Sequence, residues 1–270
     1  MSDYVKKYYD NIVRNEWKRL EDPYWKIEFL STMYIIKKYF PIKGKILDIG
    51  CGPGRYSIEL LKNGFNVTLM DLSSKNLFFA KSKIESLGLC AENYICGDAN
   101  YLNTEENDKY DCVLLMGPMY HIISRDSRIN VLKQCRRILK NEGIILISYI
   151  NFIGVLREGM NKPYAKFEDR KNIYKLLDVD SYYIDNKFNR ICFTIPEVAI
   201  KEVIDSGFRI ISYAGAESFL SGQWYQVIKY YLENRKIYMD LLEIATETCE
   251  DSKFRDNAEH LIVVANKVEV

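Results

Sequence analysis

The chain has 270 residues, of which 48% are hydrophobic, and this length and composition allow one large core in one or two domains. Its net charge of +1 offers no broad electrostatic attraction to nucleic acid or to an anionic membrane. Its seven cysteines are odd in number and contain no C-x-x-C pair, so the sequence predicts neither a metal site nor a disulfide framework and favours a reducing cytoplasm.

Two helices are predicted at the start of the chain, over residues 4–20 and 24–40. The acidic and proline residues at positions 21–23 separate them, and Pro41 stops the second one. Because they precede the first strand, we expect residues 1–42 to form a helical lid over a ligand. The chain shows no signal-peptide core and no apolar run of about 18 residues, so we expect a cytoplasmic protein without a membrane span.

The stretch KILDIGCGPGRYSIEL, residues 45–60, joins a buried strand to a glycine loop and a helix start. The apolar run at 46–49 ends abruptly at Gly50, which favours a parallel strand with Asp48 near its carboxyl end. Glycines in the loop 50–54 let the backbone approach a ligand, and residues 55–62 have helix-forming composition. This arrangement predicts the ligand-binding corner of a doubly wound sheet.

The spacing of the glycines bears on the kind of ligand. Nicotinamide-binding loops follow G-x-G-x-x-G, whereas this loop reads G-x-G-x-G, with Arg55 in place of the third fingerprint glycine. The next strand-like run, NVTLMD, ends at Asp71, where an acid can accept hydrogen bonds from both hydroxyls of a ribose. The pattern therefore predicts a ligand that contains ribose and fits a dinucleotide poorly.

Strands and helices continue to alternate up to residue 149, as βαβ units require. A polar and aromatic insertion with helical stretches follows, then a hairpin over 181–195 that turns at 185–187. Pro196 starts a helix that leads to a strand ending near residue 215. Residues 223–250 read as one helical segment, and residues 259–268 as a last strand.

Four of these segments, taken in order, resemble the class I S-adenosylmethionine-dependent methyltransferases. They are the glycine loop, the acid after the second strand, CGDANYL at 96–102, and YDCVLLMGPMYHI at 110–122, followed by a helix, turn and strand at 132–150. The resemblance implies a Rossmann-like, doubly wound α/β fold with a seven-stranded sheet. It implies a single domain over 1–270, with cap insertions at 151–193 and 216–252.

The resemblance also implies S-adenosyl-L-methionine as the cofactor. In the family the glycine loop lies against the methionine and ribose, the acid after the second strand takes the ribose, and the third segment brackets adenine. Carried over to this chain, the cofactor-binding residues are Asp48, Gly50, Cys51, Gly52, Gly54, Arg55, Asp71, Leu72, Asp98, Ala99 and Met116.

A subgroup of the family opens with Tyr-Tyr and Glu-Trp-x-Arg-Leu and later carries a GPMYH-type motif, and this chain resembles it over nearly its whole length. The matching residues suggest a substrate or lid role for Tyr8, Trp17, Arg19 and Tyr120, although Trp17 fits ordinary helix packing equally well. The chain departs from the subgroup in CFTIPE, where Thr194 and Ile195 stand in place of a histidine.

The chemistry expected of such a cofactor needs alignment of the acceptor, and a base where the acceptor must lose a proton. Of the two histidines, His121 follows the fourth strand and is the candidate base or orienting group, with hydrogen bonding to its own loop as the alternative. Tyr120 can orient the acceptor or pack on the cofactor. His260 begins the final strand and reads as structural.

Together these observations predict an enzyme that methylates oxygen or nitrogen of a small molecule. A nucleic-acid methyltransferase is disfavoured because Gly117 stands where such enzymes place an amide or acid, and the basic clusters are short. The glycine spacing argues against a nicotinamide oxidoreductase. A non-catalytic, cofactor-binding regulatory protein stays an alternative, because fold does not fix function. The sequence names neither the acceptor nor the oligomeric state.

Overall fold

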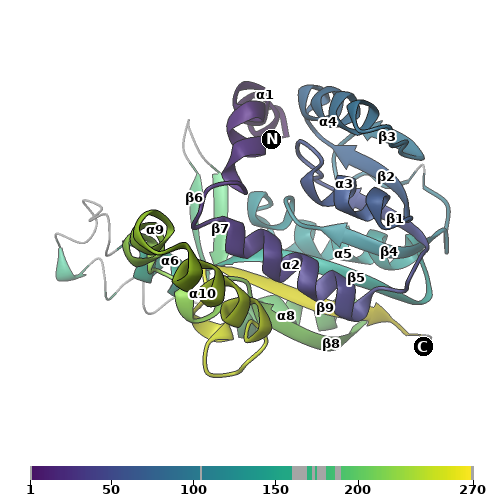
Figure 1. Cartoon of the computed structure of the whole chain (residues 1–270). Coiled ribbons are helices and arrows are strands. Elements are labelled where there is room, and N and C mark those ends of the chain that lie inside the picture. Colours follow the sequence, from purple (N-terminus) through teal and green to yellow (C-terminus); the bar gives the residue numbers. More distant parts are fainter. Residues whose placement is uncertain are drawn as a thin grey trace.

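The computed structural model describes residues 2–103, 105–159, 169–171, 174, 181–185 and 190–268. A single mixed sheet forms its centre (Figure 1). Its strands are β1 (Lys45–Ile49), β2 (Asn66–Asp71), β3 (Asn93–Cys96), β4 (Tyr110–Leu115), β5 (Leu139–Asn151), β6 (Ser181–Asp185), β7 (Arg190–Thr194), β8 (Phe208–Gly215) and β9 (His260–Lys267).

The strand order β3-β2-β1-β4-β5 is parallel throughout, and β9 runs antiparallel between β5 and β8. The chain leaves β1 toward β2 on one side and returns to β4 on the other, so the order reverses between β1 and β4. Ligands of open α/β sheets bind in the crevice outside such a reversal. The predicted Rossmann-like, doubly wound fold is therefore confirmed.

Helices cover both faces of the sheet. They are α1 (Ser2–Arg19), α2 (Lys26–Tyr39), α3 (Arg55–Lys62), α4 (Ser74–Ser86), α5 (Arg125–Ile138), α6 (Phe152–Gly159), α8 (Pro196–Asp205), α9 (Trp224–Glu233) and α10 (Arg235–Glu247). Short 3₁₀ turns are η1 (Met119–His121), η3 (Ser218–Leu220) and η4 (Arg255–Asn257).

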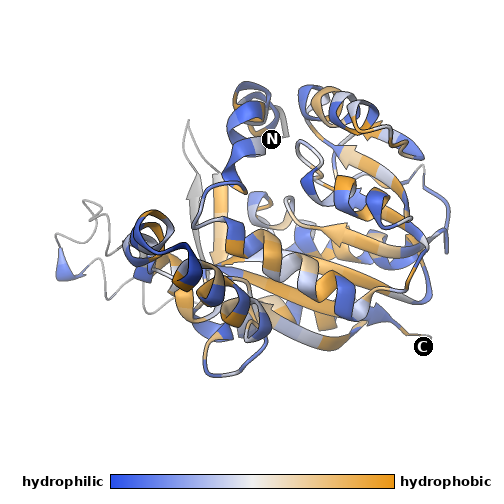
Figure 2. Ribbon diagram, viewed as in Figure 1, coloured by the Kyte–Doolittle hydropathy of each residue, from blue (hydrophilic) through white to orange (hydrophobic). Residues whose placement is uncertain are grey.

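Side chains that alternate along each strand explain the two layers. Ile46 of β1 joins a core with α2, α3 and α4, whereas Leu47 and Ile49 join a second core with α5 and α8. All three strand residues are at most 1% exposed, and each fully buried aliphatic side chain stabilises the fold by about 1.5–3 kcal/mol. Figure 2 shows the hydrophobic residues gathered on the central strands. This two-sided burial is the reason for the near-continuous apolar runs in the sequence.

The sheet is wider than the seven strands expected from the sequence, because the predicted hairpin joins it. β6 and β7 pair antiparallel, and β7 continues the sheet through Ile150 and Asn151 of β5. Residues 186 and 187 of the expected turn, and most of the insertion at 160–180, lie outside the described residues. The pairing with β5 depends on contacts distant in sequence, which alternation alone does not encode.

The predicted helix over 223–250 is two helices, α9 and α10. Asn234 has φ −149° and ψ 89°, which ends α9, and its side chain accepts a hydrogen bond from the Ile237 N–H to cap α10. Both helices pack with α2 around buried Tyr24, Ile27 and Leu242. No helix in the described part of the chain is long and apolar enough to cross a bilayer.

The N-terminal segment is divided between two positions. α1 lies beside α4 at the open edge of the sheet (Figure 1). α2, in contrast, buries Ile35, Ile36 and Phe40 in the core. Within residues 1–42, which were expected to form a lid, α1 is therefore the part that does not pack on the sheet.

Candidate functional site

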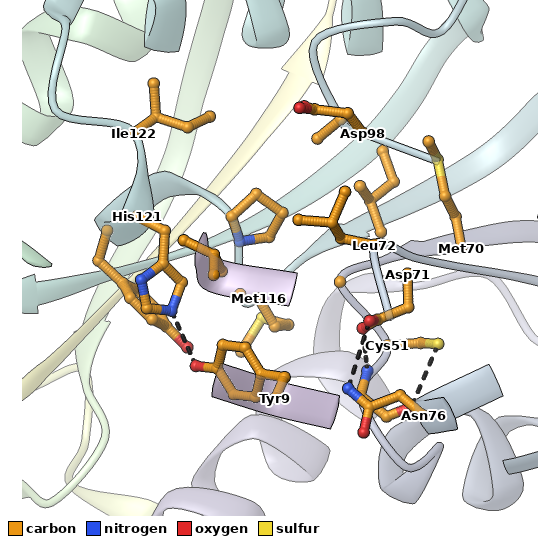
Figure 3. Close-up of a pocket in the computed structure, with 18 of the residues that line it drawn as sticks. Tyr9, Cys51, Met70, Asp71, Leu72, Asn76, Asp98, Met116, His121 and Ile122 are labelled. Atoms are coloured by element: carbon orange, nitrogen blue, oxygen red, sulfur yellow. Dashed lines mark hydrogen bonds between the residues drawn. The ribbon is translucent and has the colours of Figure 1, made fainter. Parts of the chain in front are cut away.

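A cavity lies where the carboxyl ends of β1, β2 and β4 meet α1. It is lined by the glycine loop, by the segments that follow β2, β3 and β4, and by one face of α1 (Figure 3). Most of the predicted site residues line it, namely Arg19, Gly50, Cys51, Gly52, Arg55, Asp71, Leu72, Asp98, Ala99, Met116, Tyr120 and His121. The cavity therefore coincides with the crevice that the strand order predicts.

The three glycines of the loop have positive φ angles but different tasks. A Cβ on Gly50 would lie 2.7 Å from Pro118 Cδ, and one on Gly54 would lie 2.9 Å from Ala80 Cβ, so both positions are limited by protein packing. A Cβ on Gly52 (φ +53°) would meet nothing within 4 Å, and Gly52 lines the cavity. The missing side chain of Gly52 therefore leaves space to a ligand.

Asp71 is the most fully partnered carboxylate of the cavity. One oxygen accepts the Gly52 N–H at 2.8 Å, and the other accepts the Ser73 N–H at 2.7 Å and the Asn76 side-chain amide at 3.2 Å. Burial raises its pKa, and these hydrogen bonds act in the opposite direction. Figure 3 shows Asp71 facing Asn76 at the edge of the cavity. The side chain is held rigidly while its remaining lone pairs can accept from a ligand.

The far end of the cavity is formed by the turn after β3. One oxygen of Asp98 accepts the backbone N–H of Asn100 at 2.9 Å and its side-chain amide at 2.7 Å. Leu72 and Ala99 provide apolar wall between this turn and the end of β2. A planar, polar-edged ring such as adenine suits a slot with aliphatic walls and a carboxylate at its edge.

His121 is paired with a tyrosine that comes from α1. The hydroxyl of Tyr9 lies 2.8 Å from Nε2 of His121, and both side chains line the cavity (Figure 3). Burial and the neighbouring Tyr120 and Glu16 raise the pKa of Tyr9, so its phenol stays protonated at neutral pH. With Nε2 unprotonated, the Tyr9 hydroxyl donates to it and fixes the imidazole ring.

Tyr120 stands beside this pair, with its ring centroid 4.7 Å from that of His121. Burial raises the pKa of Tyr120, as it does for Tyr9. Neither phenol is therefore an anionic base near neutral pH, which leaves the imidazole as the group between them that can take a proton.

Four predicted site residues do not line the cavity. Tyr8 is 44% exposed, because neighbouring helical residues point about 100° apart and Tyr9 takes the inward direction. Gly54 supports the start of α3. Asp48 is buried, accepts a hydrogen bond from Ser57 Oγ at 2.6 Å, and has one oxygen without a partner among the described residues. Burial raises its pKa to about 7.

Trp17 is the fourth, and it attaches α1 to the glycine loop from outside. The Arg55 guanidinium lies 3.6 Å from the centroid of the Trp17 ring, and its Nε donates to the Trp17 carbonyl at 2.9 Å. Arg55 also pairs with Glu21. Arg55 is the first residue of α3, so these contacts attach the start of α3 to α1.

Sequence reasoning missed several lining residues. Tyr9, Glu16 and Leu20 were visible as parts of the subgroup motif, but their inward direction depends on how α1 docks. Other lining residues lie within the motif segments without being predicted as site residues, namely Ile49, Pro53, Tyr56, Met70, Gly97, Asn100, Gly117, Pro118 and Ile122. No local signal marked the rest, which are Val5, Glu28, Asn76, Ile123, Ser124 and Ser127.

The residues present fit an adenosyl ligand. The open space at Gly52 and the oriented carboxylate of Asp71 are the two features on which this fit rests. The cofactor-binding roles themselves stay predictions.

Comparison with known proteins supports the same family. Residues 46–143 match a family model described as a methyltransferase domain. The chain is 24% identical over 201 residues to a glycine/sarcosine/dimethylglycine N-methyltransferase of Actinopolyspora halophila, covering 72% of this chain and 34% of that protein. It is 28% identical over 126 residues to a ubiquinone biosynthesis O-methyltransferase of Actinobacillus pleuropneumoniae, covering 45% of this chain and 53% of that one. The alignments thus span about a third to a half of these relatives' length.

Among solved structures, a 1,6-didemethyltoxoflavin N1-methyltransferase of Burkholderia thailandensis, with S-adenosylhomocysteine bound, has a TM-score of 0.58 at 16% identity. It covers 99% of this chain and 87% of that one. This likeness concerns the fold, and the matched segment contains the glycine loop, Asp71, Asp98 and His121. The chain thus has the fold of S-adenosylmethionine-dependent methyltransferases, and its residues 46–143 match a methyltransferase domain.

Proposed function

We propose that this chain transfers a methyl group from S-adenosylmethionine to an oxygen or nitrogen atom of a small molecule, with His121 as the base. The observation that carries the proposal is the Tyr9–His121 hydrogen bond inside the cavity. It places an oriented imidazole in the same cavity as the glycine loop and Asp71. The N-methyltransferase and O-methyltransferase relatives, which act on small molecules by their names, support this substrate class.

The chemistry divides between cofactor and protein. When bound, S-adenosylmethionine supplies an activated methyl group, so the protein needs no nucleophile of its own. The chain's residues hold the acceptor in line, exclude water and take a proton. As the acceptor's O–H or N–H bond gives up its proton to His121 Nε2, the acceptor's electron pair forms the new bond to the methyl carbon. The electron pair of the broken methyl–sulfur bond stays on sulfur.

Tyr9 has a defined part in this scheme. Its hydroxyl occupies the hydrogen-bonding position on Nε2 that an acceptor hydroxyl or amine would need. We propose that an incoming acceptor replaces Tyr9 as the donor to Nε2. Tyr9 then keeps His121 in the productive tautomer until the acceptor arrives.

The test is incubation of the protein with a metabolite extract and cofactor carrying a deuterated methyl group, followed by mass spectrometry. We expect labelled small molecules with wild-type protein, and a rate about two to four orders of magnitude lower with His121→Asn, because the amide hydrogen-bonds but is no base near neutral pH. The wild-type rate should rise with pH through one ionisation, and the variant should lose this dependence.

Three outcomes would contradict the proposal in whole or in part. Cofactor binding with no labelled product in any extract would favour the non-catalytic, regulatory alternative. Label found only in RNA would favour the nucleic-acid alternative. A fully active His121→Asn protein with an unchanged pH profile would remove His121 from the base role and leave the methyl transfer itself intact.

A further inference from the structure

The cavity wall that follows His121 is attached to an arginine outside the cavity. Ile122 and Ile123 line the cavity and lie between η1 and α5, and Figure 3 shows Ile122 beside His121. Nη1 of Arg128, in the first turn of α5, donates to the carbonyl oxygens of Ile122 and Ile123 at 2.8 Å each. The backbone directly after His121 is therefore held by a side chain from α5.

The same guanidinium is fixed from its other side by a buried carboxylate. Its Nε donates to Oε2 of Glu202 at 2.9 Å, and its Nη2 donates to Oε1 at 2.5 Å. Arg128 is 4% exposed and Glu202 is 1% exposed. The planar fork of an arginine can make this two-point contact and still present a third nitrogen, which the ammonium of a lysine cannot do. Glu202 of α8 thus sets the direction of Nη1.

This ion pair lies where several elements meet. α5, which contributes Arg128, packs against α8, which contributes Glu202, and η1 contacts both β5 and β7. Nη1 of Arg128 also lies 3.4 Å from Sγ of Cys192 in β7. One side chain therefore joins the loop after His121 to the last strand of the hairpin and to the helix that follows that strand.

Stability alone is a weak explanation for the ion pair. Burying two opposite charges costs desolvation free energy, and hydrophobic side chains of similar volume are often as stable in their place or more so. A hydrophobic pair would not, however, donate hydrogen bonds to the carbonyls of Ile122 and Ile123. A peptide carbonyl that is removed from water needs a donor. What only the charged pair provides is therefore the attachment of this loop.

His121 is held through both its side chain and its backbone. Nε2 of the imidazole lies 2.8 Å from the Tyr9 hydroxyl, and the His121 N–H donates to the Pro118 carbonyl at 2.9 Å. Arg128 adds an attachment on the carboxyl side of His121. Because a displacement of about 1 Å at a reacting group can lower a rate about a hundredfold, an attachment of this backbone bears on catalysis.

We propose that Arg128 is a positioning residue for His121. Held by Glu202, it fixes the backbone after His121 and so keeps the imidazole oriented toward Tyr9 and the acceptor. Arg128 acts through the loop and touches no reacting atom. The inference rests on the proposed function for the reaction that His121 serves, but the orientation of the imidazole can be measured without turnover.

The first measurement is the tautomer of the His121 imidazole, observed by nitrogen NMR. The chain has two histidines, and His260→Gln identifies the His121 signals by difference. At about pH 8, above the ordinary imidazole pKa of about 6.5, we expect a single tautomer in wild-type protein, with Nε2 unprotonated. The double variant Arg128→Met with Glu202→Leu should lose this fixed tautomer, while its melting temperature stays within about 4 °C of wild type.

Two further variants complete the set. Arg128→Lys keeps a positive charge for Glu202 but loses the fork, so it should also lose the fixed tautomer, and it serves if the double variant does not fold. Arg136→Met is the matched control, because Arg136 lies on the same helix and donates to the carbonyls of Gly207 and Val268 at 3.0 and 2.7 Å but does not line the cavity. Arg136→Met should leave the tautomer unchanged.

The second measurement separates binding from turnover. We expect Arg128→Lys to lower the rate of methyl transfer about tenfold to a hundredfold. Its affinity for S-adenosylhomocysteine, measured by calorimetric titration, should change less than about twofold. A purely structural role would lower the melting temperature and this affinity together and would leave the tautomer fixed.

The inference is wrong if the tautomer stays fixed in the Arg128 variants, if these variants keep the wild-type rate, or if wild-type His121 already populates both tautomers. A different result would contradict the proposed function alone. In that case the wild-type tautomer is fixed and is lost in Arg128→Lys, but wild-type protein forms no labelled product.

Discussion

Gly52 offers the sharpest test of where the cofactor lies. We predict that Gly52→Val leaves the protein folded but weakens binding of S-adenosylhomocysteine tenfold to a hundredfold, a loss of about 1.4–2.8 kcal/mol in binding free energy. The backbone there has φ +53°, and a Cβ would project into space that contains no protein atom within 4 Å. The new side chain would therefore meet the ligand and not the protein.

The substitution also strains the backbone, and that effect has to be separated from the effect on binding. A non-glycine residue in the left-handed region costs about 1–2 kcal/mol, and a β-branched one tolerates it poorly. Gly88 is a matched control, because it has φ +69°, would also place a Cβ in open space, and does not line the cavity. Both variants should melt about 2–8 °C below wild type.

Thermal unfolding and calorimetric titration of the two variants then decide the matter. Similar melting temperatures with a loss of affinity confined to Gly52→Val would support a ligand that crosses the glycine loop. Equal affinities in both variants would refute the reasoning, and so would a loss of affinity in Gly88→Val of the same size.

Three further predictions concern the ribose site, the N-terminal helix and the stability of the fold. Asp71→Asn should cut the preference for adenosine over 2′,3′-dideoxyadenosine by about 1–3 kcal/mol in titrations. An unchanged preference would mean that Asp71 does not bind the ribose. Deletion of residues 1–20 removes the attachments of α1 to Arg55 and His121, so the sheet should stay folded while cofactor binding weakens; amide exchange in α1 that does not slow on adding S-adenosylhomocysteine would argue for a fixed layer. The pKa of His260 is raised in the folded state, so its contribution to stability is complete below about pH 6.5 and is lost as the pH rises through about 9; denaturant unfolding of wild type and His260→Gln should converge there.

The parts of the site that could be predicted from the sequence are those made by neighbours in the chain. The strand, glycine loop and helix start lie within residues 45–62, and the acid that ends β2 is fixed by the same βαβ geometry. Short-range sterics and burial on both faces of the sheet decide these features. The cavity accordingly contains residues 50–53 of the predicted loop and two of the three predicted aspartates, Asp71 and Asp98.

The parts that could not be predicted depend on how distant segments dock. Tyr8 and Tyr9 are equivalent in the sequence, and only the rotation of α1 on its neighbours decides that Tyr9 reaches His121, which is 112 residues away. Asp48, like Asp71, lies near the carboxyl end of an apolar strand, but its side chain is buried against Ser57. The periodicity of a helix or strand predicts which of its residues share a face, but not which other elements that face contacts.

The position of His260 illustrates the same limit. From its place at the start of the last strand it reads as structural, far from the carboxyl ends of the parallel strands. β9, however, runs antiparallel to β5, so the amino end of β9 lies beside the carboxyl end of β5, where Ile150 pairs with His260. The antiparallel strand therefore brings its first residue to the ligand edge of the sheet. There it meets Glu217, which follows β8, and acts on Glu28 of α2. When the last strand of a parallel sheet runs antiparallel, its first residue lies at the edge where ligands bind. In this chain that residue is His260, which lies behind the cavity wall.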